Sequence, residues 1–399
     1  MAKIEFQELS FEEIKDKVRF FFLDNYYFDI DRSQLEDIGR FKAKNNSIEF
    51  DADENNARKK LNLIIAKGFE KLKNTFNNKK TVYLHKNMNI PLIGLNYIGI
   101  VDRNTSLIEV KPLTGCNLNC IYCSVDEGIS SKKQVDFLVE KDFLVEELKK
   151  LIKQKKADNL EVYINPNGEP LLYRPLPELI SDLSDIKEIS TISLNTNGVL
   201  LTKEKVDELI RSGLSKFNIS VNSIDEKTAK KMAGLNYDPE KVLDICRYIA
   251  EKGVSLVIAP VWLPGFNDDE IPKLIGFAEK IKAKIGIQNF LNYKFGRNPC
   301  KAMSFEEFFR KMKDLEGRYK IKLVYGPDDF NIKETQKTEK PFDKEDIIRA
   351  EILFEGRKKG EKVAFSESRL ISVPECLKKG KIKLKIVRSK HNIFIGTLI

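Results

Sequence analysis

The sequence predicts an α/β protein with a partial (β/α)6 barrel at its centre, an N-terminal helical or mixed cap and a small C-terminal β-barrel. Two observations predict the centre. Between residues 105 and 293, six short apolar segments have the character of buried strands. Each is followed by a stretch whose apolar residues have helical spacing. Repeated strand–helix units form a parallel sheet, which can curl into a partial or complete barrel.

Length and composition agree with a folded chain of several domains. At 399 residues the chain is too long for one ordinary core. Hydrophobic residues make up 42% and charged residues 32%, as in globular proteins. No apolar run reaches the roughly 18 residues of a membrane helix, and the first residues lack the apolar stretch of a signal peptide. We therefore expect a cytoplasmic protein without a membrane partner.

Residues 1–100 are expected to form the cap. Two stretches, 10–30 and 57–76, resemble helices with aromatic or aliphatic faces. We interpret them as an N-terminal helical or mixed unit that packs on the barrel, and we assign no chemistry to it.

The barrel is predicted within residues 101–325, where strands and helices alternate. The expected strands are 105–113, 160–165, 189–198, 216–223, 254–265 and 284–293. The helices that follow them are expected within 135–156, 176–186, 203–213, 238–253, 268–283 and 304–319. In such folds the loops after the carboxyl ends of the strands carry the chemistry.

Three of the six cysteines lie within eight residues, in the loop after the first expected strand. They are Cys116, Cys120 and Cys123 of the sequence CNLNCIYC. A structural zinc site would need a fourth protein ligand. Neither of the two histidines lies close to a cysteine in the sequence. Three thiolates without a fourth favour an iron–sulfur cube with one iron left open. The remaining cysteines stand alone and are interpreted as packing residues: Cys246, Cys300 and Cys376.

This sequence fits the pattern CxxxCxΦC, with Tyr122 as the aromatic residue, and by it the chain resembles the radical SAM superfamily. Further segments match the family in order, each at the end of an expected strand: NGEPLLY (167–173), LNTNG (194–198), ISVNS (219–223) and PGFNDDE (264–270). The matches cover about residues 105–320. The resemblance implies a TIM-like radical SAM barrel.

The resemblance also implies two cofactors, a [4Fe–4S] cluster and S-adenosylmethionine (SAM). Cys116, Cys120 and Cys123 would ligate the cluster, and the open iron would bind the amino and carboxylate groups of SAM. An electron from a reductant protein would then cleave SAM and give a 5′-deoxyadenosyl radical.

The turn after the second strand is expected to hold the methionine amino group of SAM. It contains Gly168, Glu169 and Pro170, which offer backbone and carboxylate acceptors to a cationic donor. The family usually has two glycines here, whereas this chain has Asn167 before Gly168. The departure is mild because Asn also tolerates a left-handed backbone.

Further candidates line the same side of the barrel. Tyr122 is expected against the adenine of SAM. Ser220 on the fourth strand is expected to bind the ribose hydroxyls or the methionine carboxylate. Asn222 lies two residues further on, so it faces the same side and is expected to line the SAM site. Candidate substrate contacts are Asn195, Asn197, Trp262, Gln288 and Tyr293.

A charged segment, residues 326–346, is predicted to link the barrel to a small C-terminal domain. Residues 347–399 contain short β-like runs separated by Gly, Lys-Gly and Pro, which predicts a small barrel. From Lys378 to His391 the sequence is rich in Lys and Arg, without an acid. The domain loosely resembles TRAM, an OB-like RNA-binding module, which implies an RNA contact. A structural lid or a dimerisation module is the alternative.

Three functions agree with the sequence. We favour a radical SAM enzyme that modifies RNA, with tRNA as the first candidate, because the basic C-terminal barrel supports an RNA partner. The net charge of +9 permits an anionic partner without requiring one. The second is a radical SAM enzyme acting on a peptide or small metabolite. Related enzymes with auxiliary clusters carry further cysteine groups after the barrel, and this sequence has none. The third is a non-catalytic metal- and nucleic-acid-binding protein, which would have no use for the SAM-site segments.

Overall fold

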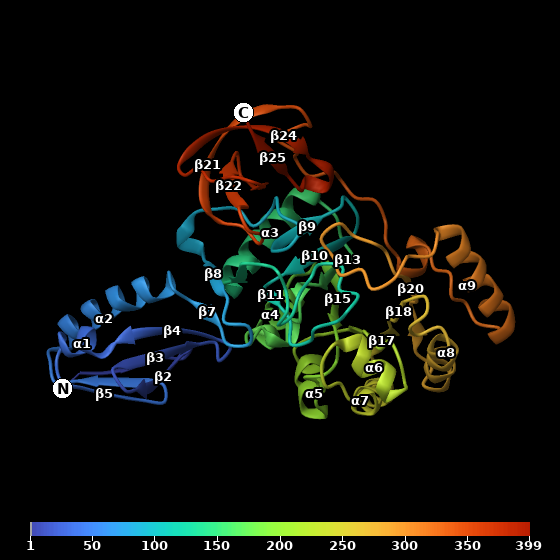
Figure 1. Ribbon diagram of the computed structural model, residues 1–399, viewed down its shortest axis with the longest axis horizontal. Helices are drawn as coiled ribbons and strands as arrows, with labels where there is room; N and C mark the ends of the chain where they lie inside the picture. The colour runs from blue at the N-terminus through green and yellow to red at the C-terminus, as the bar shows by residue number, and fades with distance from the viewer. Residues whose placement is uncertain (1) are drawn as a thin grey trace.

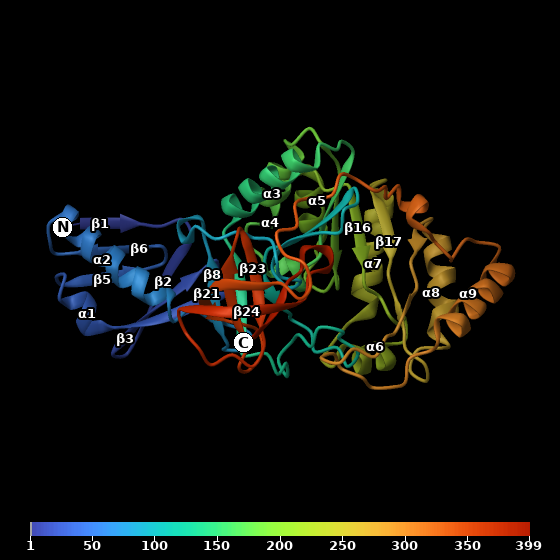
Figure 2. The same ribbon diagram turned by 90° about the horizontal axis from the view of Figure 1, so that it is seen from above.

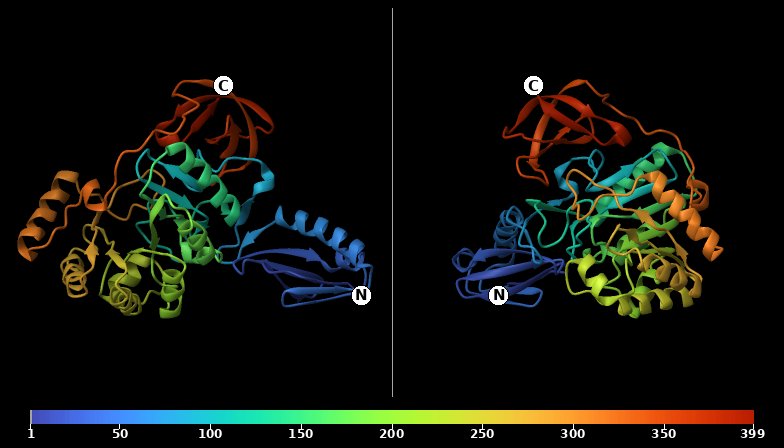
Figure 3. Two further views of the ribbon diagram at one scale, coloured as in Figure 1. Left: turned by 180° about the vertical axis from the view of Figure 1, so that it is seen from behind. Right: turned by 45° about the vertical axis from the view of Figure 1, so that its right-hand side comes forward.

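The computed structural model describes residues 2–399, which fold into three parts (Figure 1). A β-rich N-terminal part, blue in the figure, projects to one side of a central α/β domain. A small C-terminal barrel, red, lies against the central domain near β9 (Gly99–Asp102) and α3 (Lys141–Lys155). Figure 3 shows the same arrangement from two further directions.

The central domain is built on an open seven-stranded sheet. The strand order is β19-β17-β16-β15-β13-β10-β9, so six parallel strands follow one another in chain order, with antiparallel β9 at one edge. Each parallel strand lies within a predicted segment, which confirms the α/β fold. Their bounds are β10 (Leu107–Lys111), β13 (Leu160–Ile164), β15 (Ile189–Thr196), β16 (Lys216–Ile219), β17 (Ser255–Ile258) and β19 (Lys284–Ile285).

Helices connect these strands, and polar side chains cap several of them. Figure 2 shows α8 and α9 at the end of the domain farthest from the N-terminal part. Capping side chains, which accept a backbone N–H of the first turn, come from Thr202, Asp225, Asp238 and Ser304. The helices after α3 are α4 (Leu176–Ser184), α5 (Lys203–Arg211), α6 (Glu226–Ala233), α7 (Pro239–Glu251), α8 (Glu270–Lys280) and α9 (Phe305–Tyr319).

The first of these helices begins later than the sequence indicates. Val135–Val139 form strand β12, and α3 starts only at Lys141. All five side chains of β12 are buried, and a short, fully buried run has no periodicity that tells strand from helix. The deciding interaction is parallel pairing with β8 (Lys80–Leu84), which the N-terminal part supplies.

The N-terminal part is mostly β, and the expectation of two helices is corrected. Residues 10–30 lie in three antiparallel strands, β2 (Leu9–Ile14), β3 (Lys17–Phe22) and β4 (Tyr26–Asp31). Every second side chain of β3 is buried, which is the period of a strand with one buried face. Its aromatic and β-branched residues favour that conformation. Only the second stretch contains a helix as expected, α2 (Glu54–Phe69).

This part joins the centre through a shared sheet instead of capping the barrel. The sheet order is β12-β8-β7-β4-β3-β2, so β12 of the central domain is its edge strand. At the junction, the Asn25 side chain donates to the Leu172 carbonyl at 2.8 Å. The remaining elements are β1 (Ala2–Glu5), α1 (Arg32–Glu36), β5 (Phe41–Lys44), β6 (Ser47–Phe50) and β7 (Lys73–Asn74).

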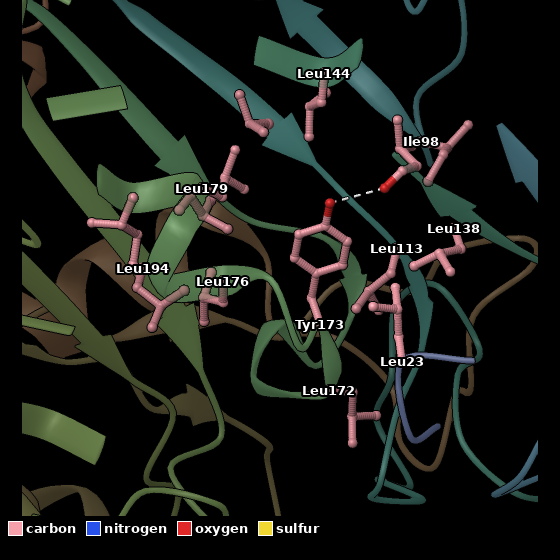
Figure 4. Close-up of a cluster of buried hydrophobic side chains, with 14 of the residues drawn as sticks. Leu23, Ile98, Leu113, Leu138, Leu144, Leu172, Tyr173, Leu176, Leu179 and Leu194 are labelled. Atoms are coloured by element: carbon pink, nitrogen blue, oxygen red, sulfur yellow. Dashed lines mark hydrogen bonds between the residues drawn. The ribbon is translucent and has the colours of Figure 1, made fainter. Parts of the chain in front are cut away.

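A buried hydrophobic cluster lies where the two parts meet (Figure 4). At its centre the Tyr173 hydroxyl donates to the Val139 carbonyl at 2.9 Å. Leucines from both parts surround the ring, among them Leu23, Leu113, Leu138, Leu144 and Leu176. Because Tyr173 ends the segment NGEPLLY, this packing fixes the turn that the sequence assigns to SAM.

The C-terminal barrel is closed, with strand order β21-β22-β23-β25-β24, and this confirms a small barrel. The predicted linker, residues 326–346, runs along the central sheet, where the Lys333 carbonyl accepts the Ser106 N–H at 2.7 Å. No helix within residues 2–399 is long and apolar enough to cross a membrane. The barrel strands are β21 (Ile347–Glu355), β22 (Lys362–Ser366), β23 (Arg369–Val373), β24 (Lys381–Arg388) and β25 (Ile395–Leu398).

Candidate active site

A cavity of about 340 Å³ opens at the carboxyl ends of the parallel strands, where the fold class places chemistry. Among the site residues expected from the sequence, Pro170 does not line it; this residue is buried in a 3₁₀ turn behind Glu169. The other eight do line the cavity: Cys116, Cys120, Tyr122, Cys123, Gly168, Glu169, Ser220 and Asn222.

The cysteine loop, residues 116–127, presents its three thiols to the cavity with amide donors around them. The Leu118 N–H donates to Cys116 Sγ at 3.4 Å, and the Glu127 N–H donates to Cys123 Sγ at 3.3 Å. Burial raises the pKa of all three thiols, to about 12 for Cys120. The thiols are therefore neutral without a metal, and metal binding must release their protons.

Arg297, in the segment between β19 and α9, holds the cysteine loop in place. Its guanidinium contacts the Asp126 carboxylate at 2.8 Å, the Cys120 carbonyl at 3.0 Å and the Glu127 carbonyl at 2.9 Å. Gly296 lies against the backbone of Cys123, and a Cβ there would approach the carbonyl oxygen to 3.2 Å. The segment after the sixth strand thus closes over the loop.

The turn with Gly168 and Glu169 is joined to the cysteine loop by backbone. Strand β14 (Asn167–Gly168) pairs in parallel with β11 (Thr114–Gly115). A Cβ on Gly168 would lie 2.0 Å from the Gly115 carbonyl oxygen, so only glycine fits there.

Glu169 is buried, with 1% of its surface exposed, and its carboxylate accepts three hydrogen bonds. The donors are the Thr196 hydroxyl at 2.5 Å, the Asn197 N–H at 2.9 Å and the Leu171 N–H at 3.1 Å. Burial raises the pKa of Glu169 to about 7, against the effect of these donors. A cation placed beside the carboxylate would therefore stabilise its charged form.

Tyr122 and Asn222 join the cysteine loop to the end of the fourth strand. The side-chain amide nitrogen of Asn222 donates to the Tyr122 hydroxyl at 2.5 Å. The side-chain oxygen of Asn222 accepts the Val261 N–H at 2.8 Å. Asn222 is thus already engaged within the protein, whereas the neighbouring Ser220 faces the cavity.

Two buried polar atoms in the cavity wall have no hydrogen-bond partner among the described residues. They are the Tyr237 hydroxyl and the Asn289 side-chain oxygen. Unpaired buried polar groups are costly, so both favour a polar ligand in this cavity. Neither residue belongs to a motif, and sequence reasoning missed them for that reason.

The candidate substrate contacts divide into two groups. Trp262 points away from the cavity, because its indole N–H donates to Asp268 at 2.9 Å and its ring packs against Phe308 of α9. That expectation is wrong for Trp262. The candidates that line the cavity are Asn195, Asn197, Gln288 and Tyr293.

Comparison with known proteins identifies the class of this site. Residues 110–278 match the radical SAM superfamily model. The chain therefore carries a radical SAM domain and is a radical SAM enzyme, which sets aside the non-catalytic alternative. Enzymes of this superfamily use a [4Fe–4S] cluster and SAM, and these are its cofactors.

The particular family follows from a relative that matches along most of the chain. The "Uncharacterized protein MJ0103" of Methanocaldococcus jannaschii is 35% identical over 372 residues, which are 85% of each chain. The chain belongs to one family with that protein.

Other similarities are more partial. The GTP 3',8-cyclase of Clostridium botulinum is 30% identical over 220 residues, and the match spans 53% of this chain and 66% of the cyclase. Among solved structures, TYW1 with a lysine-pyruvate adduct is 20% identical over 58% of this chain and 80% of its own, with a TM-score of 0.42. SuiB of Streptococcus suis bound to SAM is 15% identical over 81% of this chain and 72% of its own, with a TM-score of 0.44.

The residues of the cavity fit these cofactors. Within residues 2–399, no three His, Cys, Asp or Glu side chains gather around one point as ligands of a single ion do. Thiolates of a four-iron cube bind different irons, so they need not converge in that way. One polar cavity is surrounded by the N–H donors to sulfur, the buried Glu169 carboxylate and the two unpaired polar atoms.

Proposed function

We propose that Cys116, Cys120 and Cys123 ligate the [4Fe–4S] cluster of a radical SAM enzyme that modifies RNA. The observation that carries the ligand assignment is that all three thiols line one cavity and that N–H donors reach two of the sulfurs. The reduced cluster supplies the electron that cleaves SAM.

The proposed SAM contacts are of two kinds, a charge interaction with Glu169 and a close backbone approach at Gly168. Glu169 accepts the methionine ammonium, while Gly168 lets the backbone approach without a side chain in between. Ser220 offers its hydroxyl to the ribose or carboxylate. Tyr122 lies beside the adenine and is held there by Asn222, so Asn222 acts through Tyr122.

The substrate class rests on a group of cations and aromatic rings beside the cavity, here called the rim: Lys133, Tyr293, Lys294, Phe295 and Lys358. Tyr293 lines the cavity, and Tyr293 and Phe295 are 48% and 53% exposed. The Lys358 ammonium lies 3.3 Å from the centre of the Phe295 ring. Exposed rings stack on nucleobases, and lysines bind phosphate.

The rim brings two further lysine charges, those of Lys133 and Lys294, near Lys358. Burial lowers the pKa of Lys358; Glu361 opposes the shift, and the charges of Lys133 and Lys294 add to it. A bound phosphate would stabilise the charge of Lys358, which the two neighbouring ammonium groups disfavour. The rim therefore supports a nucleotide as the group presented to the cavity.

A second basic surface lies on the C-terminal barrel and supports a polymeric nucleotide. A groove over the paired strands β21 and β24 is lined by four cations, one carboxylate and one aromatic ring: Arg349, Lys378, Lys381, Lys383, Glu351 and Phe365. A phosphate backbone can follow such a groove while one nucleotide occupies the rim. This is the observation that favours RNA over a peptide.

A free nucleotide is the second candidate substrate. The rim offers the same cations and rings to a nucleoside triphosphate, and the partial relatives are GTP 3',8-cyclases. Within residues 2–399, the other cysteines do not gather into an auxiliary cluster, since Cys246 and Cys376 are buried in separate cores. This weighs against the peptide-modifying alternative.

The test is SAM cleavage by the anaerobically reconstituted full chain with a chemical reductant, followed as 5′-deoxyadenosine. Three arms receive total tRNA, GTP or neither. We expect tRNA to bind at low salt and to accelerate cleavage. Stimulation by GTP alone would replace RNA with a free nucleotide. If neither binds or stimulates, the substrate is not a nucleotide.

A further inference from the structure

One arginine of the C-terminal barrel reaches into the interior of the central domain. Arg357 lies in the loop between β21 and β22 and is only 2% exposed. Its guanidinium forms ion pairs with Glu127 and with Asp136, the latter at 2.7 Å. It also donates to the Thr114 hydroxyl and to the Val135 carbonyl, at 3.0 Å for the carbonyl.

The partners of Arg357 are as buried as the arginine itself. Glu127 is 4% exposed, and Asp136 and Thr114 are completely buried. A buried ion pair is strongly destabilised when one partner is removed, because the other charge is left without solvent or counterion. The position of each partner is therefore tied to the presence of the guanidinium.

Two of these partners lie at the two sides of the cysteine loop, Thr114 in the strand just before it and Glu127 as its last residue. Thr114 precedes Cys116 by two residues, and its hydroxyl also bonds the Phe137 N–H at 2.8 Å. Glu127 is the residue whose N–H donates to Cys123 Sγ. One guanidinium thus holds the entry to the loop through a hydroxyl and the exit through a carboxylate.

The N-terminal part reaches the same group of residues. Asp136 accepts the Asn77 amide at 2.8 Å and the Asn74 amide at 3.3 Å, both from the β7–β8 segment. A Cβ on Gly115 would lie 3.1 Å from that same Asn74 amide. All three parts of the chain therefore meet directly behind the cysteine loop.

We propose that Arg357 is a positioning residue of the cluster site, so that the C-terminal barrel is a structural component of the radical SAM centre and not only a substrate-binding module. This inference rests on the proposed cysteine ligands and is independent of the RNA assignment. Arg357 fixes the Glu127 N–H against Cys123 and the strand end before Cys116. Hydrogen bonds to ligand sulfur help to set cluster potential and stability.

The test compares Arg357→Lys and Arg357→Met with Arg369→Met in the full chain. Arg369 is the matched control, since it is a buried arginine of the same barrel whose side chain bonds the Glu339 and Ser368 carbonyls and not the cysteine loop. After anaerobic reconstitution we measure iron per chain, the electron paramagnetic resonance spectrum and the reduction midpoint.

Arg357→Met is expected to bind the cluster about 10- to 100-fold more weakly, the usual effect of losing an outer-shell partner. Arg357→Lys should keep a cluster with a more negative midpoint, because one ammonium cannot reach every partner of the guanidinium and a weakened N–H···S bond disfavours the reduced cluster. Arg369→Met should lower only the melting temperature.

Wild-type iron content, spectrum and midpoint in both Arg357 variants would overturn the proposal. So would an equal loss in Arg369→Met, because the effect would then be general destabilisation. If Arg357→Met does not fold, the Lys variant and the triple variant Glu127→Gln/Asp136→Asn/Arg357→Met, which removes the arginine together with both of its counterions, decide the question by the same readouts. Failure of the ligand assignment itself is separate: it would appear as full iron content in Cys116→Ala.

Discussion

Burial and hydrogen bonding have opposite effects on the charge of Glu169. Its carboxylate is buried and accepts three hydrogen bonds, of which two hold the turn after β13 to the end of β15 and the third lies within the turn. Burial nevertheless favours its neutral form and raises its pKa to about 7. A methionine ammonium beside it would favour the charged form, so SAM binding and proton binding compete at this residue.

We expect SAM affinity of the wild type to fall as the pH is lowered through about 7, because a protonated Glu169 cannot accept the ammonium. Glu169→Gln should weaken SAM binding by about 10- to 150-fold, the equivalent of roughly 1.5–3 kcal/mol for a charge-assisted hydrogen bond. It should also remove this pH dependence. Calorimetric titration of SAM between pH 6 and 8 measures both. Equal affinity at both ends of the range in the wild type would contradict the assignment.

The stability of the SAM-free protein should change in the opposite direction. The pKa of Glu169 is raised above its ordinary value of 4.5, so the folded state binds more protons than the unfolded state between about pH 4.5 and 7. The contribution of Glu169 to the free energy of unfolding is therefore lost as pH rises through about 7. The difference in melting temperature between wild type and Glu169→Gln, followed against pH, isolates this contribution.

The cysteine ligands make a simpler prediction. Replacement of Cys116, Cys120 or Cys123 by Ala should abolish the visible absorbance of the reconstituted cluster and most of the bound iron. Cys246→Ala is the matched control, because Cys246 is a fully buried thiol of α7 with no role in the cavity. Iron loss in the control equal to that in the three variants would show that the ligands are assigned wrongly.

The segment between β20 (Gln288–Asn289) and α9 forms most of the rim. Stacking of one base on an aromatic ring contributes about 1–3 kcal/mol, so Phe295→Ala should weaken tRNA binding by roughly 5- to 150-fold. Phe309→Ala is the control, since Phe309 is an exposed aromatic residue of α9 (44% exposed) that is not part of the rim. Filter binding at low salt measures both. Equal losses would mean that exposed apolar area, and not the rim, binds RNA.

The elements of the central domain could be predicted because strand and helix alternate with strong periodicity and because the motifs mark the strand ends. The same reasoning failed for β2, β3 and β4, where hairpins bring aromatic residues onto one face at every second position. It failed for β12 because that strand is decided by its partner β8, more than 50 residues earlier. Pairing between distant segments leaves no local signal.

The residues of the site likewise include some with a local sequence signal and some without one. The cysteines, Glu169 and Ser220 belong to segments with a recognisable pattern. Tyr237 and Arg357 are brought to the site by folding from segments without one, so a single sequence gives no sign of their contribution. The least predictable features of this protein are thus the contacts between its three parts.

These contacts change how the role of the C-terminal barrel must be tested. Deleting the residues after Lys340 removes the basic barrel that we propose binds RNA. It would also remove Arg357 and leave Glu127 and Asp136 buried without their counterion. We expect such a truncated chain to lose its cluster, so that its inactivity would say nothing about RNA.

Charge reversal within the full chain gives the cleaner test. Lys381→Glu/Lys383→Glu changes two exposed side chains of the β24 groove and leaves the barrel core intact, because the alternating Ile382 and Leu384 are the buried ones. Each lost phosphate contact should reduce the slope of log affinity against log salt by about 0.7–0.9, so the double variant should flatten it by roughly 1.4–1.8 and weaken binding at low salt. Lys313→Glu on α9, at the far end of the central domain, supplies a control of the same charge type. The cluster spectrum of the double variant should remain that of the wild type, since Arg357 is untouched. An unchanged salt slope would show that the groove does not follow an RNA backbone, and a free nucleotide at the rim would then be the better substrate.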